Sequence, residues 1–495
     1  MFSLLSTASL LGAFTALLAI VFQAYLSSNE LVRLTVILQH LRDLEVEYSV
    51  TDQVRVAIGY GSCGDLHVRA VDFLRYDENI GRALNTSEYT FGDIASEQEF
   101  LLNFAYYFQR GAAAERFTAN REMFLNLVER AKKSSTAEHH WALGGNAPVI
   151  GTRMAIEGAN VVLGAKMSSK LKTHLLPEVR LTGSLVEDDD IHLILEYNTG
   201  DTWGGLVSPR ANRYILHNDH HNPLVSSLEE FEAALEGFDP DLFIVSGLQM
   251  MDNYVYREGV REARLDKVRQ QLQAQSPHTR IHFEMASFVE LQLLQLLMRN
   301  VLPFSDSIGM NEQELDNLQQ VLETGRISLV ADCNPRVAHS LDQARSVFAL
   351  LNQPSDIVGR RPLSRMHLHT LAYQAFIVAK GSSWRHTKQA AAKASLTAHR
   401  HVCATNIVNP DAAYLQMDGS FAVSAKPSAR RIHFENRNPV SCWEEIIPLA
   451  HESASQQRQS IDVEICVAPV LICKNAIQTV GAGDNISGAG LVLQI

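Results

Sequence analysis

The sequence has no Cys-x-x-Cys pair among its six cysteines, which excludes zinc ribbons and dithiol redox motifs with that spacing. We expect these cysteines to be free buried thiols. A single disulfide is the alternative if the compartment is oxidising. His-Glu-x-x-His is also absent. The histidines of residues 217–222 and of positions 367 and 369 have no cysteine to complete a zinc set, so a zinc site is not favoured.

Long basic stripes are missing as well. Lys and Arg total 43 against 55 Asp and Glu, a net charge of -12. A nucleic-acid-binding domain usually carries a basic face, whereas the densest basic runs here are the four residues 130–133 and the pair 430–431. We therefore expect no nucleic-acid partner. With 46% hydrophobic and 20% charged residues, the composition is that of a globular protein.

Charge is absent from one particular segment. Met1–Asn29 contains no charged side chain, and Leu4–Leu26 consists mainly of Leu, Ala, Phe, Ile and Val. As a helix this run would measure about 35 Å, enough to cross a bilayer core. The small residues that precede a cleavage site are poorly represented. Residues 1–29 are therefore predicted to be a signal peptide or signal anchor, which places the protein in the endoplasmic reticulum, in the lumen or anchored to the membrane. Secretion stays open.

From about residue 50 to 495 the chain alternates short apolar runs with helical patterns, which is typical of an α/β fold with a mainly parallel sheet. A glycine-rich turn at 59–65 indicates close backbone approach. The segment 97–135 is predicted to be helical, with a break at Gly111. Mobile loops are expected at 425–438 and 453–460. Strands are expected at 54–59, 160–164, 192–197, 213–216, 242–247, 280–285, 366–379 and 463–472, and helices at 35–47, 227–235 and 258–274.

Chemistry is most strongly indicated near the C-terminus. Gly481-Ala482-Gly483-Asp484 follows an apolar strand and precedes small and apolar residues. A glycine turn that opens a helix directs backbone N–H groups at one point and binds phosphate. A carboxylate at such a site is reasonable if Asp484 takes a proton from an attacking hydroxyl. The alternative is an ordinary Asp that complements the helix dipole.

Other motifs each allow a functional and a structural interpretation. Gly144-Gly145-Asn146 before a helix binds a hydroxyl-rich ligand or simply forms a turn and N-cap. His282 and Glu284 share one face of a strand, where Glu284 could hold Mg²⁺ directly or through water. Asn311 and Glu314 are neighbours on a first helical turn, where they serve a ligand, close a capping box, or both.

Together these motifs resemble the ADP-dependent glucokinase family of the ribokinase-like superfamily. The ordered set is His282-Phe283-Glu284, Asn311-Glu312-Gln313-Glu314 and Gly481-Ala482-Gly483-Asp484, and residues 111–115, 144–147, 246–251 and 367–370 also match. The likeness runs from about Val54 to the C-terminus. The hydrophobic N-terminus resembles the animal branch, whose members enter the endoplasmic reticulum.

The resemblance implies a ribokinase-like large α/β domain with a smaller discontinuous lid. It implies phosphoryl transfer from ADP to the 6-hydroxyl of glucose, with Mg²⁺, giving glucose 6-phosphate and AMP. We expect a monomer that binds glucose and ADP and touches a membrane only through residues 1–29. The implied roles are general base for Asp484; Mg²⁺ site for Glu284, Glu314 and Asp484; nucleotide contacts for Gly481, Ala482, Gly483 and Asn311; and sugar contacts for Asp65, Glu115, Gly145 and Asn146.

One departure concerns sugar affinity. The family usually has Asn where this chain has Gly61, so one sugar hydrogen bond, worth about 1 kcal/mol, is in question. Alternative functions are a kinase for another sugar such as fructose 6-phosphate, using ADP or ATP, a catalytically silent nucleotide or sugar sensor, and a membrane-tethered interaction protein. Glu115 argues against a phosphorylated acceptor, because its carboxylate would repel the phosphate.

Overall fold

A computed structural model gives the structure of the protein over residues 29–48, 54–80, 93–328, 331–332, 334–449 and 459–495. The predicted N-terminal segment lies outside the described residues except for Asn29, as do residues 453–458 of a predicted loop. In the part of the chain that is described, no helix is both long and apolar enough to cross a membrane.

A ten-stranded sheet forms the centre of the larger part of the molecule. Its strands from β6 to β14 run parallel, and three further strands at the other edge pair antiparallel. In spatial order the strands are β19 (Ser441–Pro448), β20 (Ser460–Pro469), β15 (Tyr373–Ala379), β14 (Arg365–His369), β13 (Ser307–Met310), β12 (Arg280–Glu284), β11 (Leu242–Val245), β1 (Arg55–Gly59), β5 (Asn160–Gly164) and β6 (Val179–Thr182).

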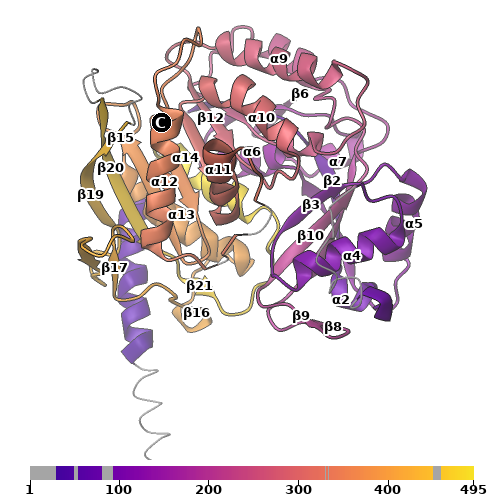
Figure 1. Cartoon of the computed structure of the whole chain (residues 1–495), viewed down its shortest axis with the longest axis horizontal. Coiled ribbons are helices and arrows are strands. Elements are labelled where there is room, and N and C mark those ends of the chain that lie inside the picture. The colour runs from indigo at the N-terminus through magenta and orange to yellow at the C-terminus, as the bar shows by residue number, and fades with distance from the viewer. Residues whose placement is uncertain (1–28, 49–53, 81–92, 329–330, 333, 450–458) are drawn as a thin grey trace, which may run out of the picture.

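A second, five-stranded sheet forms the smaller part, seen with α2, α4 and α5 on one side of Figure 1. It is discontinuous in sequence: β5 and β6, which follow β4 in the chain, belong to the large sheet, and the chain returns to the small sheet at β7. Its order is β3 (Ala114–Phe117), β10 (Asn212–His217), β7 (Ile191–Tyr197), β2 (Cys63–Arg69) and β4 (His139–Gly144). The predicted α/β class, with a mainly parallel sheet and a smaller discontinuous unit, is confirmed.

Helices cover both sheets, and short ribbons complete the described elements. Residues 29–47 form a helix without a label in Figure 1. The other helices are α2 (Ala70–Phe73), α4 (Glu97–Phe108), α5 (Arg121–Lys132), α6 (Asn146–Ile156), α7 (Ser169–Lys172), α8 (Leu228–Leu235), α9 (Val260–Gln273), α10 (Leu291–Asn300), α11 (Glu312–Thr324), α12 (Val337–Leu351), α13 (Thr387–Val402) and α14 (Ala482–Val492). The 3₁₀ turns are η1 (Leu248–Met251), η2 (Leu302–Phe304) and η3 (Pro410–Ala412), and the ribbons pair β8 (Thr202–Trp203) with β9 (Leu206–Val207), β16 (Ala413–Tyr414) with β21 (Ile472–Cys473), and β17 (Ser420–Ala422) with β18 (Arg431–His433).

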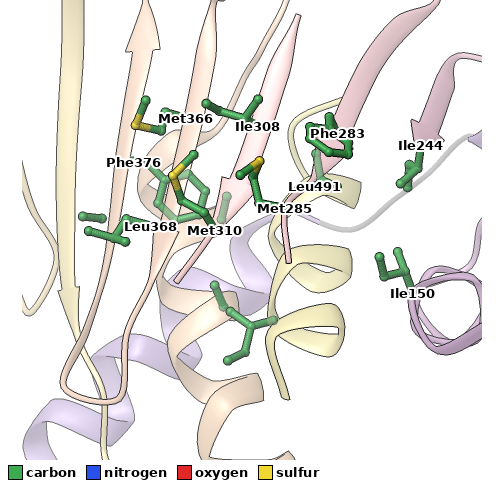
Figure 2. Close-up of a cluster of buried hydrophobic side chains, with 14 of the residues drawn as sticks. Ile150, Ile244, Phe283, Met285, Ile308, Met310, Met366, Leu368, Phe376 and Leu491 are labelled. Atoms are coloured by element: carbon green, nitrogen blue, oxygen red, sulfur yellow. The ribbon is translucent and has the colours of Figure 1, made fainter. Parts of the chain in front are cut away.

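The two faces of the central strands differ in polarity. Phe283, Ile308 and Met366 are in register across β12, β13 and β14, and they belong to the buried apolar cluster of Figure 2. Because successive side chains point to opposite faces, the residues between them form polar rows on the other face. α14 packs on that polar face, where its Ser487 contacts Glu284.

Three expectations from the sequence are corrected. Ala114–Phe117 is a strand rather than part of a helical segment, because it pairs with β10 at the edge of the small sheet. The run 366–379 is not one strand but a hairpin of β14 and β15. Four cysteines form two disulfides, Cys403–Cys473 and Cys442–Cys466, and the buried Cys63 is free.

The helix of residues 29–47 is part of the folded core. Leu34, Ile37, Leu38 and Leu41 are buried in the large hydrophobic cluster, and Arg400 donates two hydrogen bonds to Glu45 at 2.6 and 2.9 Å. The predicted boundaries at residues 29 and 50 stay predictions, but the packing joins this helix to the large sheet.

Ile37→Ala is therefore expected to destabilise the protein by about 2–5 kcal/mol, because Ile37 has no exposed surface and truncation leaves a cavity. Chemical denaturation of the purified chain measures this loss. Val46, on the same helix, is 74% exposed, so Val46→Ala serves as the control and should change stability little. Equal small effects from both variants would show that the helix does not contribute to the fold.

Candidate active site

A cavity of about 500 Å³ lies where the two sheets meet. Residues of β3 and β10 from the small sheet line one side of it. The start of α14, the end of β12 and the start of α11 from the large part line the other. Of the residues singled out from the sequence, Glu115, Asn146, Glu284, Asn311, Glu314, Gly481, Ala482, Gly483 and Asp484 line this cavity.

Asp484 occupies the first turn of α14, which begins after Gly481. Gly481 has φ +69°, a conformation that L-residues with side chains rarely adopt, so glycine lets the chain turn directly from the preceding loop into the helix. The Asp484 carboxylate accepts a hydrogen bond from Asn146 Nδ2 at 3.0 Å. Burial raises the pKa of Asp484 to about 7, and the nearby charge of Glu284 adds to this rise.

The pKa of Glu284 is shifted in the opposite direction to that of Asp484. Its Oε2 accepts a hydrogen bond from His282 at 2.9 Å, and its Oε1 accepts from His369 at 3.1 Å and from Ser487 at 2.9 Å. Burial alone would raise the pKa of Glu284, but the hydrogen bonds from the two histidines outweigh it and hold the pKa well below its ordinary value. Glu284 is therefore a buried carboxylate at the cavity whose surroundings favour the ionised form.

Gly309 makes room for that carboxylate. It lies beside Glu284 in the register of β12 and β13, and a Cβ at position 309 would lie 2.2 Å from Glu284 Oε2. Only glycine leaves space for the carboxylate to extend across the neighbouring strand. The Glu284–Gly309 pair is thus a requirement of the site that the sequence alone does not reveal.

Glu314 closes a capping box and also lines the cavity. Asn311 caps α11 by accepting from the backbone N–H of Glu314, and Glu314 accepts in return from the backbone N–H of Asn311 at 2.9 Å. This is the capping box expected from the sequence. The same carboxylate lines the cavity, and burial raises its pKa to about 7.

The donor set fits a divalent cation that keeps part of its water shell. Glu284, Glu314 and Asp484 offer carboxylate oxygens, the ligands that Mg²⁺ prefers. Within the described residues, however, they are not among the groups whose ligand atoms all lie within 4.8 Å of one another. Both oxygens of Glu314 already accept hydrogen bonds from Asn311. Binding of the cation through water molecules therefore fits these three carboxylates better than direct coordination by all of them.

A line of polar groups leads from Asp484 to Glu115. Gln249 Nε2 donates to Asn146 Oδ1 at 2.8 Å and approaches Glu115 Oε2 at 3.2 Å. His192 Nδ1 lies 3.9 Å from Glu115 Oε1. Burial would lower the pKa of His192, but the charges of Asp219, Glu115 and Asp65 outweigh it and raise the pKa to about 10. Glu115 therefore faces the cavity between an amide and a charged imidazole.

Asp65 and Gly145 lie behind the cavity wall rather than among its lining residues. Asp65 is buried, accepts a hydrogen bond from the Cys63 thiol at 3.1 Å and fills the space beside Gly144, where a Cβ would lie 2.0 Å from its Oδ1. A Cβ on Gly145 would lie 2.6 Å from the Gly61 carbonyl oxygen. The close backbone approach predicted at the glycine-rich turn is present, and it joins two chain segments.

Several residues of the site have no recognisable pattern in the sequence. Arg213 lines the cavity from β10, and in the described structure its Nε is buried without a hydrogen-bond partner, so it is available to an anion. Single basic residues on strands carry no sequence signal. In the sequence, Gln249 stands out only as part of a matching stretch, and His369 only as part of one and as an unfavoured zinc candidate. Their contacts to Asn146 and to Glu284 depend on tertiary structure.

The fold and the site define a ribokinase-like phosphotransferase: a mainly parallel sheet, a smaller discontinuous sheet, and a carboxylate at a glycine-initiated helix start facing the cavity between them. The family model for the ADP-specific phosphofructokinase/glucokinase conserved region matches residues 54–493, and the chain belongs to that family.

Named relatives agree with this assignment. The chain is 31% identical over 444 residues to an ADP-dependent glucokinase of Bos taurus, covering 88% of this chain and 84% of the relative. It is 28% identical over 457 residues to a probable ADP-dependent glucokinase of Caenorhabditis elegans, with the same coverage. Among solved structures, an ADP-dependent kinase in complex with fructose-6-phosphate and ADPbetaS matches with TM-score 0.61 at 16% identity, covering 93% of this chain and 97% of that one; this match shows the fold alone.

Gly309→Ala is expected to lower turnover at least about tenfold, because the added methyl group displaces the Glu284 carboxylate from its hydrogen bonds. Steady-state kinetics and thermal denaturation measure the effect. Gly205→Ala is the matched control, since a Cβ there meets nothing within 4 Å. Wild-type turnover in a folded Gly309→Ala variant would contradict the role given to the glycine.

Proposed function

We propose that this protein is an ADP-dependent glucokinase, which transfers the β-phosphoryl group of ADP to the 6-hydroxyl of glucose and releases glucose 6-phosphate and AMP. The observation that carries the proposal is the buried Asp484 at the start of α14. It faces a cavity lined by residues of both sheets, and burial raises its pKa to about 7.

Asp484 acts as the general base. A carboxylate whose pKa lies near neutral accepts a proton more readily than an ordinary Asp and is still partly ionised at neutral pH. Asn146 holds Oδ1 in place, which leaves Oδ2 to accept the proton of the sugar hydroxyl. Positioning of this kind accounts for much of phosphoryl-transfer catalysis.

The start of α14 and Arg213 receive the phosphates. Backbone N–H groups of the first helical turn and the helix dipole favour an anion at Gly481–Gly483. Arg213 supplies a positive charge from the opposite wall, with its Nε unpaired among the described contacts. The cavity continues along Val402, Tyr414 and Ile472, an aliphatic and aromatic surface suited to a purine.

The sugar occupies the end of the cavity near Glu115. Carboxylate and amide oxygens of Glu115 and Gln249 accept hydrogen bonds from sugar hydroxyls, and Gln249 Oε1 is buried without a partner in the described structure. A sugar that already carries a phosphate would meet the negative charge of Glu115. This supports glucose over fructose 6-phosphate as the acceptor.

Mg²⁺ belongs to the proposal as well. When bound, the ion neutralises charge on the transferring phosphoryl oxygens. Glu284, ionised by its hydrogen bonds, together with Glu314 and Asp484, would hold it largely through water. We further propose that the protein acts as a monomer, which light scattering of the purified chain would check.

Asp484→Asn should reduce turnover about 10²–10⁴-fold, the usual contribution of a general base.

The same substitution should increase the stability of the folded protein at alkaline pH. Because the pKa of Asp484 in the folded protein is about 7, above the ordinary 3.8, folding favours the protonated acid, and this contribution is lost as pH rises towards 7. At pH 8 the Asn variant, which has no buried charge, should be more stable than wild type by about 1 kcal/mol or more.

Denaturation at pH 8 and pH 5 measures the stability difference, which should shrink at the lower pH. Asp356→Asn, at an exposed position, is the control for both readouts. Near wild-type turnover in Asp484→Asn would remove the base assignment.

A product assay tests donor, acceptor and metal together. Glucose with ADP and Mg²⁺ should give AMP and the fastest turnover, and EDTA should abolish it. Equal or faster reaction with ATP would overturn the donor, and preference for fructose 6-phosphate would overturn the acceptor. Nucleotide binding without any turnover would favour a sensor instead.

We also propose that residues 1–29 direct the chain to the endoplasmic reticulum, on the evidence of their uncharged, apolar sequence. A reporter fused after Asn29 should appear in the endoplasmic reticulum fraction, and the same reporter without the segment should stay in the cytosol. Alkaline extraction then separates a membrane anchor from a cleaved signal peptide. A cytosolic fusion would refute the proposal.

A further inference from the structure

A transverse row of three polar side chains lies in the large sheet next to Glu284. His282, Ser307 and Arg365 are in register across β12, β13 and β14, and none has exposed surface. Arg365 Nη1 donates to Ser307 Oγ at 2.9 Å, Ser307 Oγ lies 2.8 Å from His282 Nδ1, and His282 Nε2 lies 2.9 Å from Glu284 Oε2. A continuous hydrogen-bonded chain therefore joins a buried arginine to the ionised carboxylate of the site.

Arg365 is unusual because it is a buried cation whose described contacts are neutral. Its Nε donates to Gln494 Oε1 at 2.6 Å, and its guanidinium lies 5.2 Å from the ring centre of Phe376 and 5.4 Å from that of Trp384. Burying such a charge without a carboxylate partner is costly. The hydrogen bonds to Ser307 and Gln494 offset part of this cost and fix the direction of the guanidinium.

The directions of the hydrogen bonds follow from the two ends of the chain. A guanidinium only donates, so Ser307 accepts from Arg365; an ionised carboxylate only accepts, so His282 donates to Glu284 from Nε2. A second positive charge on His282, one hydroxyl away from Arg365, is disfavoured. His282 is therefore neutral, its Nδ1 carries a lone pair, and the Ser307 proton points to it.

We propose that Ser307 and Arg365 are positioning residues: their hydrogen bonds orient the His282 ring and select the tautomer whose Nε2–H donates to Glu284, which fixes this carboxylate towards the cavity. The expected effects on the reaction rate rest on the proposed function, whereas the tautomer of His282 does not depend on it. If Ser307 lost its hydroxyl, Nδ1 would lose its donor. The other tautomer would then turn a lone pair towards Glu284 and repel it.

The test is ¹⁵N NMR of the histidine-labelled full-length protein without ligands, with the His282 signals identified by their loss in His282→Gln. Two-bond couplings distinguish the ring nitrogens. In wild type we expect a protonated Nε2 and an unprotonated Nδ1 at neutral pH. A proton on Nδ1, alone or together with Nε2, would overturn the proposal even if every kinetic variant failed to fold.

The variants supply the second readout. Ser307→Ala should mix the two tautomers and raise the Mg²⁺ concentration for half-maximal rate about 10-fold or more, with the KM for glucose changed less than about twofold. Arg365→Lys, which keeps a donor and a charge, should have a smaller effect than Arg365→Met. Ser305→Ala is the matched control, because that buried hydroxyl donates to the Val301 carbonyl and is outside the row.

Two results would contradict the role of the row. One is a folded Ser307→Ala protein with wild-type ¹⁵N shifts and unchanged Mg²⁺ dependence. The other is a loss shared equally by Ser307→Ala and Ser305→Ala, which would indicate general damage to packing. If no sugar is phosphorylated at all, the proposed function fails while the wild-type tautomer still decides the inference.

Discussion

The site depends on one buried carboxylate, Glu284, being held ionised by three neutral or weakly basic donors. His282 comes from its own strand, His369 from β14 and Ser487 from α14, so these hydrogen bonds also fix α14 against the sheet. An ionised carboxylate without such donors would be expelled or protonated at this depth. Because α14 carries both Asp484 and the glycine turn at Gly481–Gly483, its packing against β12 sets the position of these groups relative to Glu284.

Two carboxylates in one cavity consequently take different charge states. Glu284 receives three hydrogen bonds, and its pKa is lowered. Asp484 receives one, from Asn146, and its pKa rises to about 7 by burial and by repulsion from Glu284. Pairs of titratable groups whose environments separate their pKa values in this way commonly divide the roles of electrostatic stabiliser and base. Here the difference arises from the number of donors around each group, since both are buried.

The sequence predicted the parts of the site that local patterns encode. The glycine turn predicted the start of α14, the period of two placed His282 and Glu284 on one face, and the Asn311–Glu314 spacing predicted the capping box. Non-local packing determined the rest. Strand β3 is a strand only because β10 lies beside it, Gly309 is needed only because Glu284 reaches across it, and Asp65 lies behind the wall because β2 and β4 pair at Gly144. No single segment carries that information.

The hydrogen-bonded row from Asp484 through Asn146 and Gln249 to Glu115 crosses from the larger part of the molecule to the small sheet. Its longest hydrogen bonds are at that crossing. Asn146, Gln249 and Asp484 belong to the larger part and are joined at 3.0 and 2.8 Å, whereas Glu115 belongs to the small sheet and lies 3.2 and 3.5 Å from the Gln249 amide. A shift of the small sheet would therefore break the Glu115 contact first and leave the base and its Asn146 partner in place. Since Arg213 lies on β10, next to the strand of Glu115, a shift of that sheet would displace both side chains together. In the proposed reaction, such a shift over both substrates would bring Glu115 and Arg213 to Asp484, which Asn146 already holds in place, and would exclude water.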